Sequence, residues 1–99
     1  MATLHLINAP SPRSAALAQC LYAAKAGDTV LLIENGTFCA VASTFDAIAR
    51  KRTELTWCAL ADDVRSRGIE SLLANTVALV DDRAFVDLVI AHQPIVSWS

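Results

Sequence analysis

The chain has 99 residues, the size of one domain, so we expect a single domain over residues 1–99. Its formal net charge of −2 and isoelectric point near 5.5 argue against broad binding to nucleic acids or anionic membranes. No apolar run reaches the roughly 18 residues that span a bilayer, and the N-terminus lacks the basic and apolar segments of a signal peptide.

The first predicted unit is a strand, a proline-containing turn and a helix. Residues 4–7 are mostly apolar, which is typical of a short buried strand. Ser11 is a favourable N-cap, and Pro12 suits the first helical position, where a missing N–H is harmless. We expect the helix to continue through residues 15–26 and to end at Gly27 in a left-handed conformation.

The next segment predicts a second strand and then allows two conformations for residues 37–41. Residues 29–33 form a continuous aliphatic run, as in a parallel strand that is covered on both faces. Asn35 and Gly36 then form a strong hairpin signal, with residues 37–41 as the returning strand. The alternative is a tight turn into a short helical segment, followed by a helix over about residues 43–52. The spacing of apolar residues favours a helix in the later part.

The second half continues to alternate between strands and helices. The predicted strands are residues 54–60, 76–80 and 95–98, and the predicted helices are residues 61–67 and 83–92. Gly68 suits the end of the first helix, Asp81 or Asp82 caps the second, and Pro94 prevents its continuation. This pattern predicts an α/β fold, a three-layer sandwich with a largely parallel five-stranded sheet and helices on both faces.

Apolar residues make up 55% of the chain, above the roughly 45–50% of typical domains. Because so small a domain has little interior, we expect other subunits to cover part of its apolar surface. The cysteines Cys20, Cys39 and Cys58 form no close pair and are odd in number, which does not indicate a disulfide framework. We therefore expect free thiols and a cytoplasmic protein.

Cys20 is the one thiol that we consider as a chemical group. At 100° per residue it shares an apolar helix stripe with Leu17, Leu21 and Ala24, and buried cysteine commonly acts as a small hydrophobe. A reactive thiolate prefers a helix N-terminus or a cationic neighbour, and no base lies at helical contact spacing. The residues alone therefore favour a structural role for Cys20.

The other polar candidates have simple structural explanations. His5 lies among leucines in the first strand and is expected to be a buried, hydrogen-bonded histidine, and His92 ends a helix. Histidines and cysteines show no metal-ligand spacing, and we expect no cofactor. Arg50, Lys51 and Arg52 form a short basic run, which we interpret as a solvated helix end rather than an RNA contact.

The whole chain resembles the TusB/DsrH family, the smallest of three related subunits in sulfur-relay complexes. No single motif carries this resemblance; it depends on short features in the same order and spacing over essentially all 99 residues. These features are Leu4, His5, Asn8, Ser11, Pro12, Gly27, Asp28, residues 31–36, residues 61–63, Arg65, Arg67, Gly68, residues 85–88 and Trp98.

The resemblance implies a DsrEFH-type sandwich in a cytoplasmic heterohexamer with two homologous partners, a TusC/DsrF-like and a TusD/DsrE-like subunit. It also implies small sulfur-carrier proteins as partners, without direct contact to nucleic acid or membrane. Such a complex passes persulfide sulfur toward 2-thiolation of the tRNA wobble uridine, or handles sulfur in dissimilatory oxidation. The alternative to this function is a self-associating small α/β binding module without catalysis, and a third hypothesis is an independent thiol sulfurtransferase.

In the resembling complexes the main persulfide cysteine belongs to a different subunit, so whether this chain is itself an enzyme stays open. DsrH-type members are similar to this chain in carrying a cysteine at the position of Cys20, whereas members of the tRNA branch commonly lack it. Cys20 therefore favours the DsrH type, or a tRNA-branch protein that keeps a spare thiol, and it is our candidate catalytic residue on resemblance alone. Its chemistry would be thiolate attack on a donor persulfide, followed by transfer to a second thiol.

Overall fold

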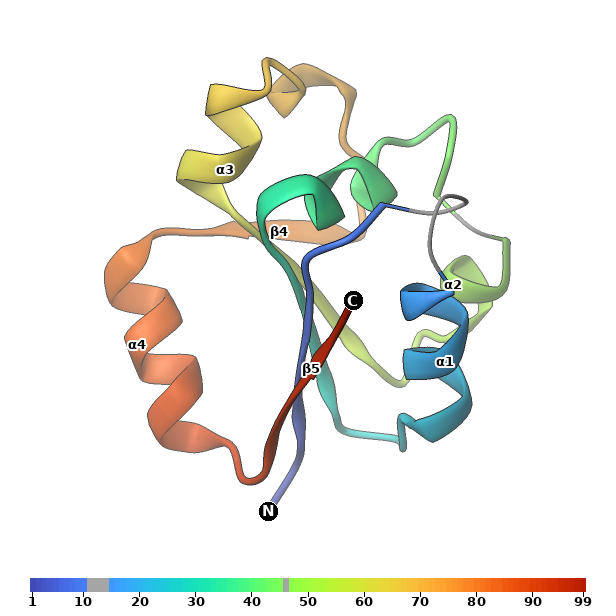
Figure 1. The fold of residues 1–99 in the computed structure, drawn as a ribbon, viewed down its shortest axis with the longest axis vertical. Helices are drawn as coiled ribbons and strands as arrows, with labels where there is room; N and C mark the ends of the chain where they lie inside the picture. The colour runs from blue at the N-terminus through green and yellow to red at the C-terminus, as the bar shows by residue number, and fades with distance from the viewer. Residues whose placement is uncertain (11–14, 46) are drawn as a thin grey trace.

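Five parallel strands form one sheet in the order β4-β3-β2-β1-β5 (Figure 1). The structure is a computed structural model that describes residues 1–10, 15–45 and 47–99. The strands are β1 (Leu4–Ile7), β2 (Thr29–Leu32), β3 (Thr56–Leu60), β4 (Val77–Val80) and β5 (Ile95–Trp98). The helices are α1 (Ala16–Ala23), α2 (Ala47–Lys51), α3 (Ala61–Ser66) and α4 (Asp82–Ala91), with the 3-10 helices η1 (Glu34–Ala40) and η2 (Glu70–Leu72). The predicted α/β sandwich with a parallel five-stranded sheet is confirmed.

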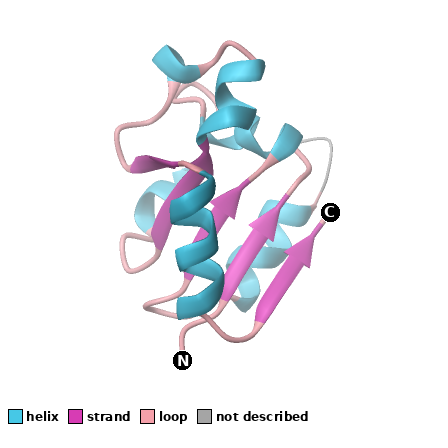
Figure 2. Ribbon diagram, turned by 90° about the vertical axis from the view of Figure 1, so that its left-hand side faces the viewer, coloured by secondary structure: helices cyan, strands magenta, loops and turns pink. Residues whose placement is uncertain are grey.

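The strand order explains how the helices divide between the faces of the sheet. The chain moves from β1 through β2 and β3 to β4 and then returns past β1 to β5. Right-handed crossovers place the helices of the outward path on one face and the helix of the return path on the other. Figures 1 and 2 show that α4 lies on the opposite side of the sheet from α1 and α2.

The sheet therefore has two hydrophobic cores of unequal size. Successive side chains in a strand point to opposite faces, so Ile7 and Val30 join the core under α1, whereas Leu4 and Leu31 face α4. The larger core also holds Val64 of α3. All four residues of β2 are buried, which confirms the prediction of a strand covered on both faces.

α4 leaves its side of the sheet incompletely covered. A helix is about 10 Å across, whereas five strands spaced about 4.8 Å apart span about 19 Å. No residue of α4 is buried, and Phe85 and Leu88 are only half-buried against the smaller core. On its outer side Val86 is 54% and Ile90 74% exposed. This uncovered surface matches the excess of apolar residues in the chain.

The hairpin expected at Asn35 and Gly36 does not form, because the chain continues from β2 into η1. Glu34 adopts a positive φ of 51°, which turns the chain away from the strand direction. Gly36 then packs so closely on β1 that an added Cβ would lie 2.0 Å from the carbonyl oxygen of Ile7. The helical alternative is the observed one, and Val41 forms an isolated antiparallel bridge with Leu73.

The helix boundaries correct two expectations. α1 ends at Ala23, three residues before the predicted end, because the Arg52 guanidinium binds the carbonyl oxygens of Leu21 and Ala24. Gly27 has the predicted positive φ, 90°, but in the turn after the helix. α2 is shorter than the predicted residues 43–52.

Other predicted helix ends agree with the structure or lie outside its described part. Asp81 is the N-cap of α4, and its Oδ1 accepts the N–H of Ala84 at 2.8 Å. Gly68 follows α3 with the expected left-handed φ of 66°. The predicted cap at Ser11 and Pro12 falls outside the described residues.

Candidate functional site

Cys20, the sequence-predicted site residue, lies in the middle of α1 with its side chain inside the larger core. It is fully buried, among residues such as Ile7 and Leu17. Burial raises the pKa of its thiol from 9.0 to about 12; the negative charge of Asp28 adds to this rise, and Arg52 opposes it. The raised pKa keeps the thiol protonated at pH 7, and burial shields it from reagents in this conformation.

The other two cysteines are also buried. Cys39 donates its thiol to the carbonyl oxygen of Ala9 at 3.8 Å, and Cys58 lies in the smaller core beside Leu4 and Leu31. Burial raises the pKa of the Cys58 thiol. All three thiols of the chain are therefore enclosed by the fold, and sulfur chemistry at any of them requires local opening.

A buried hydrogen-bonded network lies on the α1 side of the sheet, and sequence spacing does not reveal it as a unit. The indole Nε1 of Trp98 donates to Nδ1 of His5 at 3.1 Å, and Nε2 of His5 lies 3.0 Å from Oδ2 of Asp28. Because an indole can only donate, Nδ1 of His5 must accept, so the proton sits on Nε2 and points to Asp28. The prediction that His5 is a buried, hydrogen-bonded histidine is confirmed.

Asp28 accepts three hydrogen bonds and links the segments at the start of the sheet. Besides His5, it accepts the backbone N–H of Thr3 through Oδ1 and that of Lys25 through Oδ2, each at 3.0 Å. Burial acts to raise its pKa, but the hydrogen bonds from the N–H groups of Lys25, His5 and Thr3 together hold that pKa below its ordinary value. The carboxylate thus fixes the turn after α1 against β1.

His92 makes a second link beside this network. Its Nδ1 lies 2.7 Å from the carbonyl oxygen of Leu88, and its Nε2 lies 2.8 Å from Oγ1 of Thr29. A carbonyl can only accept, so Nδ1–H donates to Leu88 and closes the end of α4. Both histidines therefore have structural partners.

The basic run after α2 divides between two roles. Arg52 binds α1 and pairs with Glu54, so it is part of the scaffold rather than a solvated helix end. Arg50 and Lys51 are exposed, as predicted. The guanidinium of Arg50 donates to the carbonyl oxygen of Ala42 and lies 5.7 Å from the centre of the Phe45 ring.

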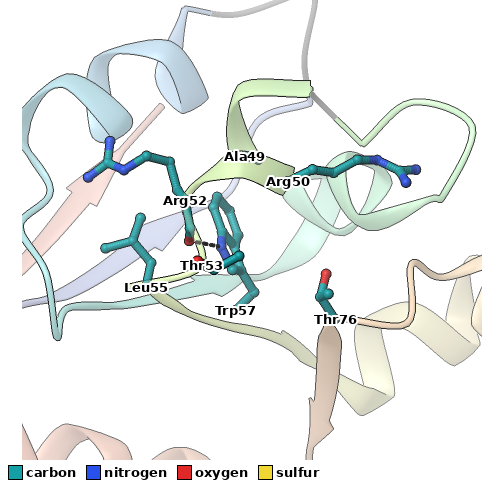
Figure 3. Close-up of a pocket in the computed structure, with 7 residues that line it drawn as sticks. All are labelled: Ala49, Arg50, Arg52, Thr53, Leu55, Trp57 and Thr76. Atoms are coloured by element: carbon teal, nitrogen blue, oxygen red, sulfur yellow. Dashed lines mark hydrogen bonds between the residues drawn. The ribbon is translucent and has the colours of Figure 1, made fainter.

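Two neighbouring cavities open beside Arg50. The first, of about 230 Å³, has Leu55 and Trp57 among its lining residues, and Figure 3 shows Arg50 and Arg52 extending to opposite sides of it. The second, of about 380 Å³, includes Phe45 and Leu73 in its lining. Among the described residues, no group of three acidic, histidine or cysteine side chains could hold a metal ion. No helix in residues 1–10, 15–45 and 47–99 is long and apolar enough to cross a membrane.

Comparison with known proteins shows which family the chain is similar to. Residues 10–95 match the family model described as DsrH like protein. The chain is 31% identical to Protein TusB of Pectobacterium parmentieri over 96 residues, which cover 96% of this chain and 99% of that protein. Protein TusB of Klebsiella pneumoniae (strain 342) is 30% identical over 95 residues, with 96% and 99% covered.

A solved structure is similar in fold. The solution NMR structure of protein Tm0979 from Thermotoga maritima superposes with a TM-score of 0.64 at 25% identity, and the match covers 89% of this chain and 92% of that one. The similarities extend over most of both chains in each case.

Proposed function

Because the chain belongs to the DsrH-like family, we propose that it is a subunit of a sulfur-relay complex that acts in tRNA thiolation. The observation that carries this proposal is the near full-length match to proteins named TusB. The same names favour the tRNA branch over dissimilatory sulfur oxidation, which is the alternative role of such a complex.

The burial of all three thiols supports a role as a non-autonomous subunit. A sulfur carrier needs a thiolate that can meet a donor persulfide, and Cys20, the best candidate by position, is enclosed and has its pKa raised to about 12. The main persulfide cysteine then belongs to a homologous partner. Cys20 acts as a secondary carrier only when α1 moves away from the sheet.

The uncovered side of α4 supports an obligate assembly. Val86, Val89 and Ile90 are spaced to form one exposed stripe on the outer side of this helix, and the sheet beside it is only partly covered. A stripe of this kind is typical of a helix that packs on another subunit. We propose a TusC/DsrF-like and a TusD/DsrE-like subunit as the partners, in a cytoplasmic heterohexamer that receives sulfur from small carrier proteins.

A genetic replacement tests the function. The gene is deleted in its own host, and total tRNA is digested and analysed for 2-thiouridine by mass spectrometry. We expect the modified nucleoside to disappear and the wild-type gene to restore it. A Cys20→Ser gene that restores it fully assigns Cys20 a structural role, and unchanged 2-thiouridine in the deletion strain contradicts the proposal.

A further inference from the structure

We propose that the groove around Arg50 binds an acidic, extended segment of a partner protein. This groove consists of the two neighbouring cavities beside Arg50, and its defining residues are Phe45, Arg50, Leu55, Trp57, Leu73 and Thr76. It lies on the side of the sheet that carries α1 and α2, so it is separate from the α4 surface (Figures 1 and 3). The inference goes beyond the sulfur-relay function and does not depend on it.

The two cavities are joined at two residues. Arg50 and Thr76 line both of them, so the cavities adjoin at one point with a cation beside it. Together they offer two hollows with apolar side chains in their walls and one shared arginine, Arg50. An extended peptide places alternate side chains on the same face, about 7 Å apart, so it can put two apolar side chains in the hollows and a carboxylate between them.

The floor of the groove is apolar and rigid. Phe45 and Trp57 are 6% and 5% exposed and pack edge-to-face, with ring centroids 5.4 Å apart and an interplanar angle of 85°. The indole N–H of Trp57 donates to the carbonyl oxygen of Arg52 at 3.3 Å, which fixes the ring further. A ligand therefore meets a preformed surface and orders little of it on binding.

The charge of the groove selects the ligand. The Arg50 guanidinium lies over the Phe45 ring and donates to the carbonyl oxygen of Ala42. Lys51 follows it at the exposed end of α2. Among the residues that the structure describes, no carboxylate forms an ion pair with Arg50 or Lys51. A fixed guanidinium with donors to spare binds a carboxylate in a bidentate manner. The chain as a whole has a net charge of −2 and so repels an acidic ligand. The local attraction of such a ligand therefore comes from Arg50 and Lys51.

A protein segment fits this site better than RNA does. Binding of single-stranded RNA needs several cations along the backbone and exposed aromatic faces on which bases stack. Here both rings are buried against each other, and the net charge opposes a polyanion. The apolar hollows match aliphatic side chains instead.

Fluorescence anisotropy with defined probes tests the proposal. The first probe is a fluorescein-labelled peptide, Gly-Leu-Asp-Glu-Asp-Leu-Asp-Gly, which places Leu, Glu and Leu on one face when extended; the others are its lysine counterpart, a version with serine for leucine, and a labelled oligouridylate. We expect the acidic peptide to bind with a Kd on the order of 100 µM that weakens with added salt, and the other three probes to bind at least about tenfold more weakly.

Substitutions locate the binding. Arg50→Glu and Thr76→Trp, which fills the junction of the cavities, should each weaken binding about tenfold or more. Arg83→Glu is the matched control, because it makes the same charge change at an exposed position on α4 and should leave binding unchanged. Circular dichroism of each variant verifies that it is folded. Equal binding of acidic and basic peptides, preference for the oligonucleotide, or full binding by folded Arg50→Glu protein overturns the proposal.

Discussion

The indole Nε1 of Trp98 donates to Nδ1 of His5 at 3.1 Å and so joins the last strand of the sheet to its neighbour β1. The two rings also stack, with centroids 6.1 Å apart and planes inclined by 28°. The other ring nitrogen of His5, Nε2, donates to the carboxylate of Asp28, and this carboxylate fixes the turn before β2. One polar chain thus connects β5, β1 and β2 across the α1 side of the sheet.

Trp98→Phe should destabilise the fold by about 1–3 kcal/mol. Phenylalanine keeps an aromatic side chain but removes the indole N–H donor, so Nδ1 of His5 stays buried without a partner. Urea denaturation followed by circular dichroism measures the free energy of unfolding. Tyr22→Phe is the control, because Tyr22 is 96% exposed and its change should stay within about 0.5 kcal/mol. Equal stability of the Trp98 variant and the wild type would show that this hydrogen bond contributes nothing.

The lowered pKa of Asp28 predicts how the stability of the fold depends on pH. Its pKa in the folded protein is lowered from the ordinary value of 3.8, so the unfolded chain binds the proton more tightly. The stabilisation is therefore present above pH 3.8 and is lost as the pH falls through the lower pKa of the folded state. Denaturation midpoints measured between about pH 7 and pH 2 should fall steeply below about pH 4 in the wild type. The fall should be shallower in Asp28→Asn than in Asp87→Asn, an exposed control; equal slopes contradict the prediction.

Cys20 should react with iodoacetamide only when the fold opens. Because it is fully buried and burial raises its pKa, we expect alkylation of the native protein to be at least about 100-fold slower than in urea. Mass spectrometry of peptides after timed quenching measures the rate for each cysteine. Rapid labelling of Cys20 in the native protein, or a sulfur adduct of about 32 Da on it after incubation with a persulfide donor, would establish an accessible thiol.

Gly36 and Gly68 should differ in their response to substitution by alanine. An added Cβ at Gly36 would lie 2.0 Å from the carbonyl oxygen of Ile7, so backbone must move, and we expect a loss of about 3 kcal/mol or more. An added Cβ at Gly68 would have no atom within 4 Å, so only the positive φ opposes a side chain there. We expect Gly68→Ala to cost about 1 kcal/mol. Thermal unfolding of both variants tests this order. Similar midpoints contradict the close approach of η1 to β1.

Local patterns predicted the strands and several helix ends. The aliphatic run of β2 and the cap at Asp81 depend on neighbours in sequence, and both are observed. The predicted end of α1 was wrong because it depends on Arg52, which is 31 residues from the carbonyl of Leu21 that it binds. The turn at Gly36 depends in the same way on its contact with β1.

The candidate site was less predictable than the fold. Cys20 was correctly placed on the apolar stripe of its helix, and that stripe explains its burial. The Trp98–His5–Asp28 network joins residues 93 and 23 positions apart, so no local spacing could reveal it. The signals in the sequence were a polar residue, His5, in an otherwise apolar strand, and an acidic residue, Asp28, directly before the next strand. The groove around Arg50 also depends on residues brought together by the sheet.

Native mass spectrometry of the co-purified complex tests the central claim most directly. The tagged chain is co-expressed with a TusC/DsrF-like and a TusD/DsrE-like subunit, the proposed partners, and an Ile90→Asp variant is compared with Leu72→Asp, an exposed control at 52%. We predict a hexamer with two copies of each subunit, lost with Ile90→Asp and kept with Leu72→Asp. A wild-type chain that purifies alone as a stable monomer, or that assembles only with itself, would contradict the account.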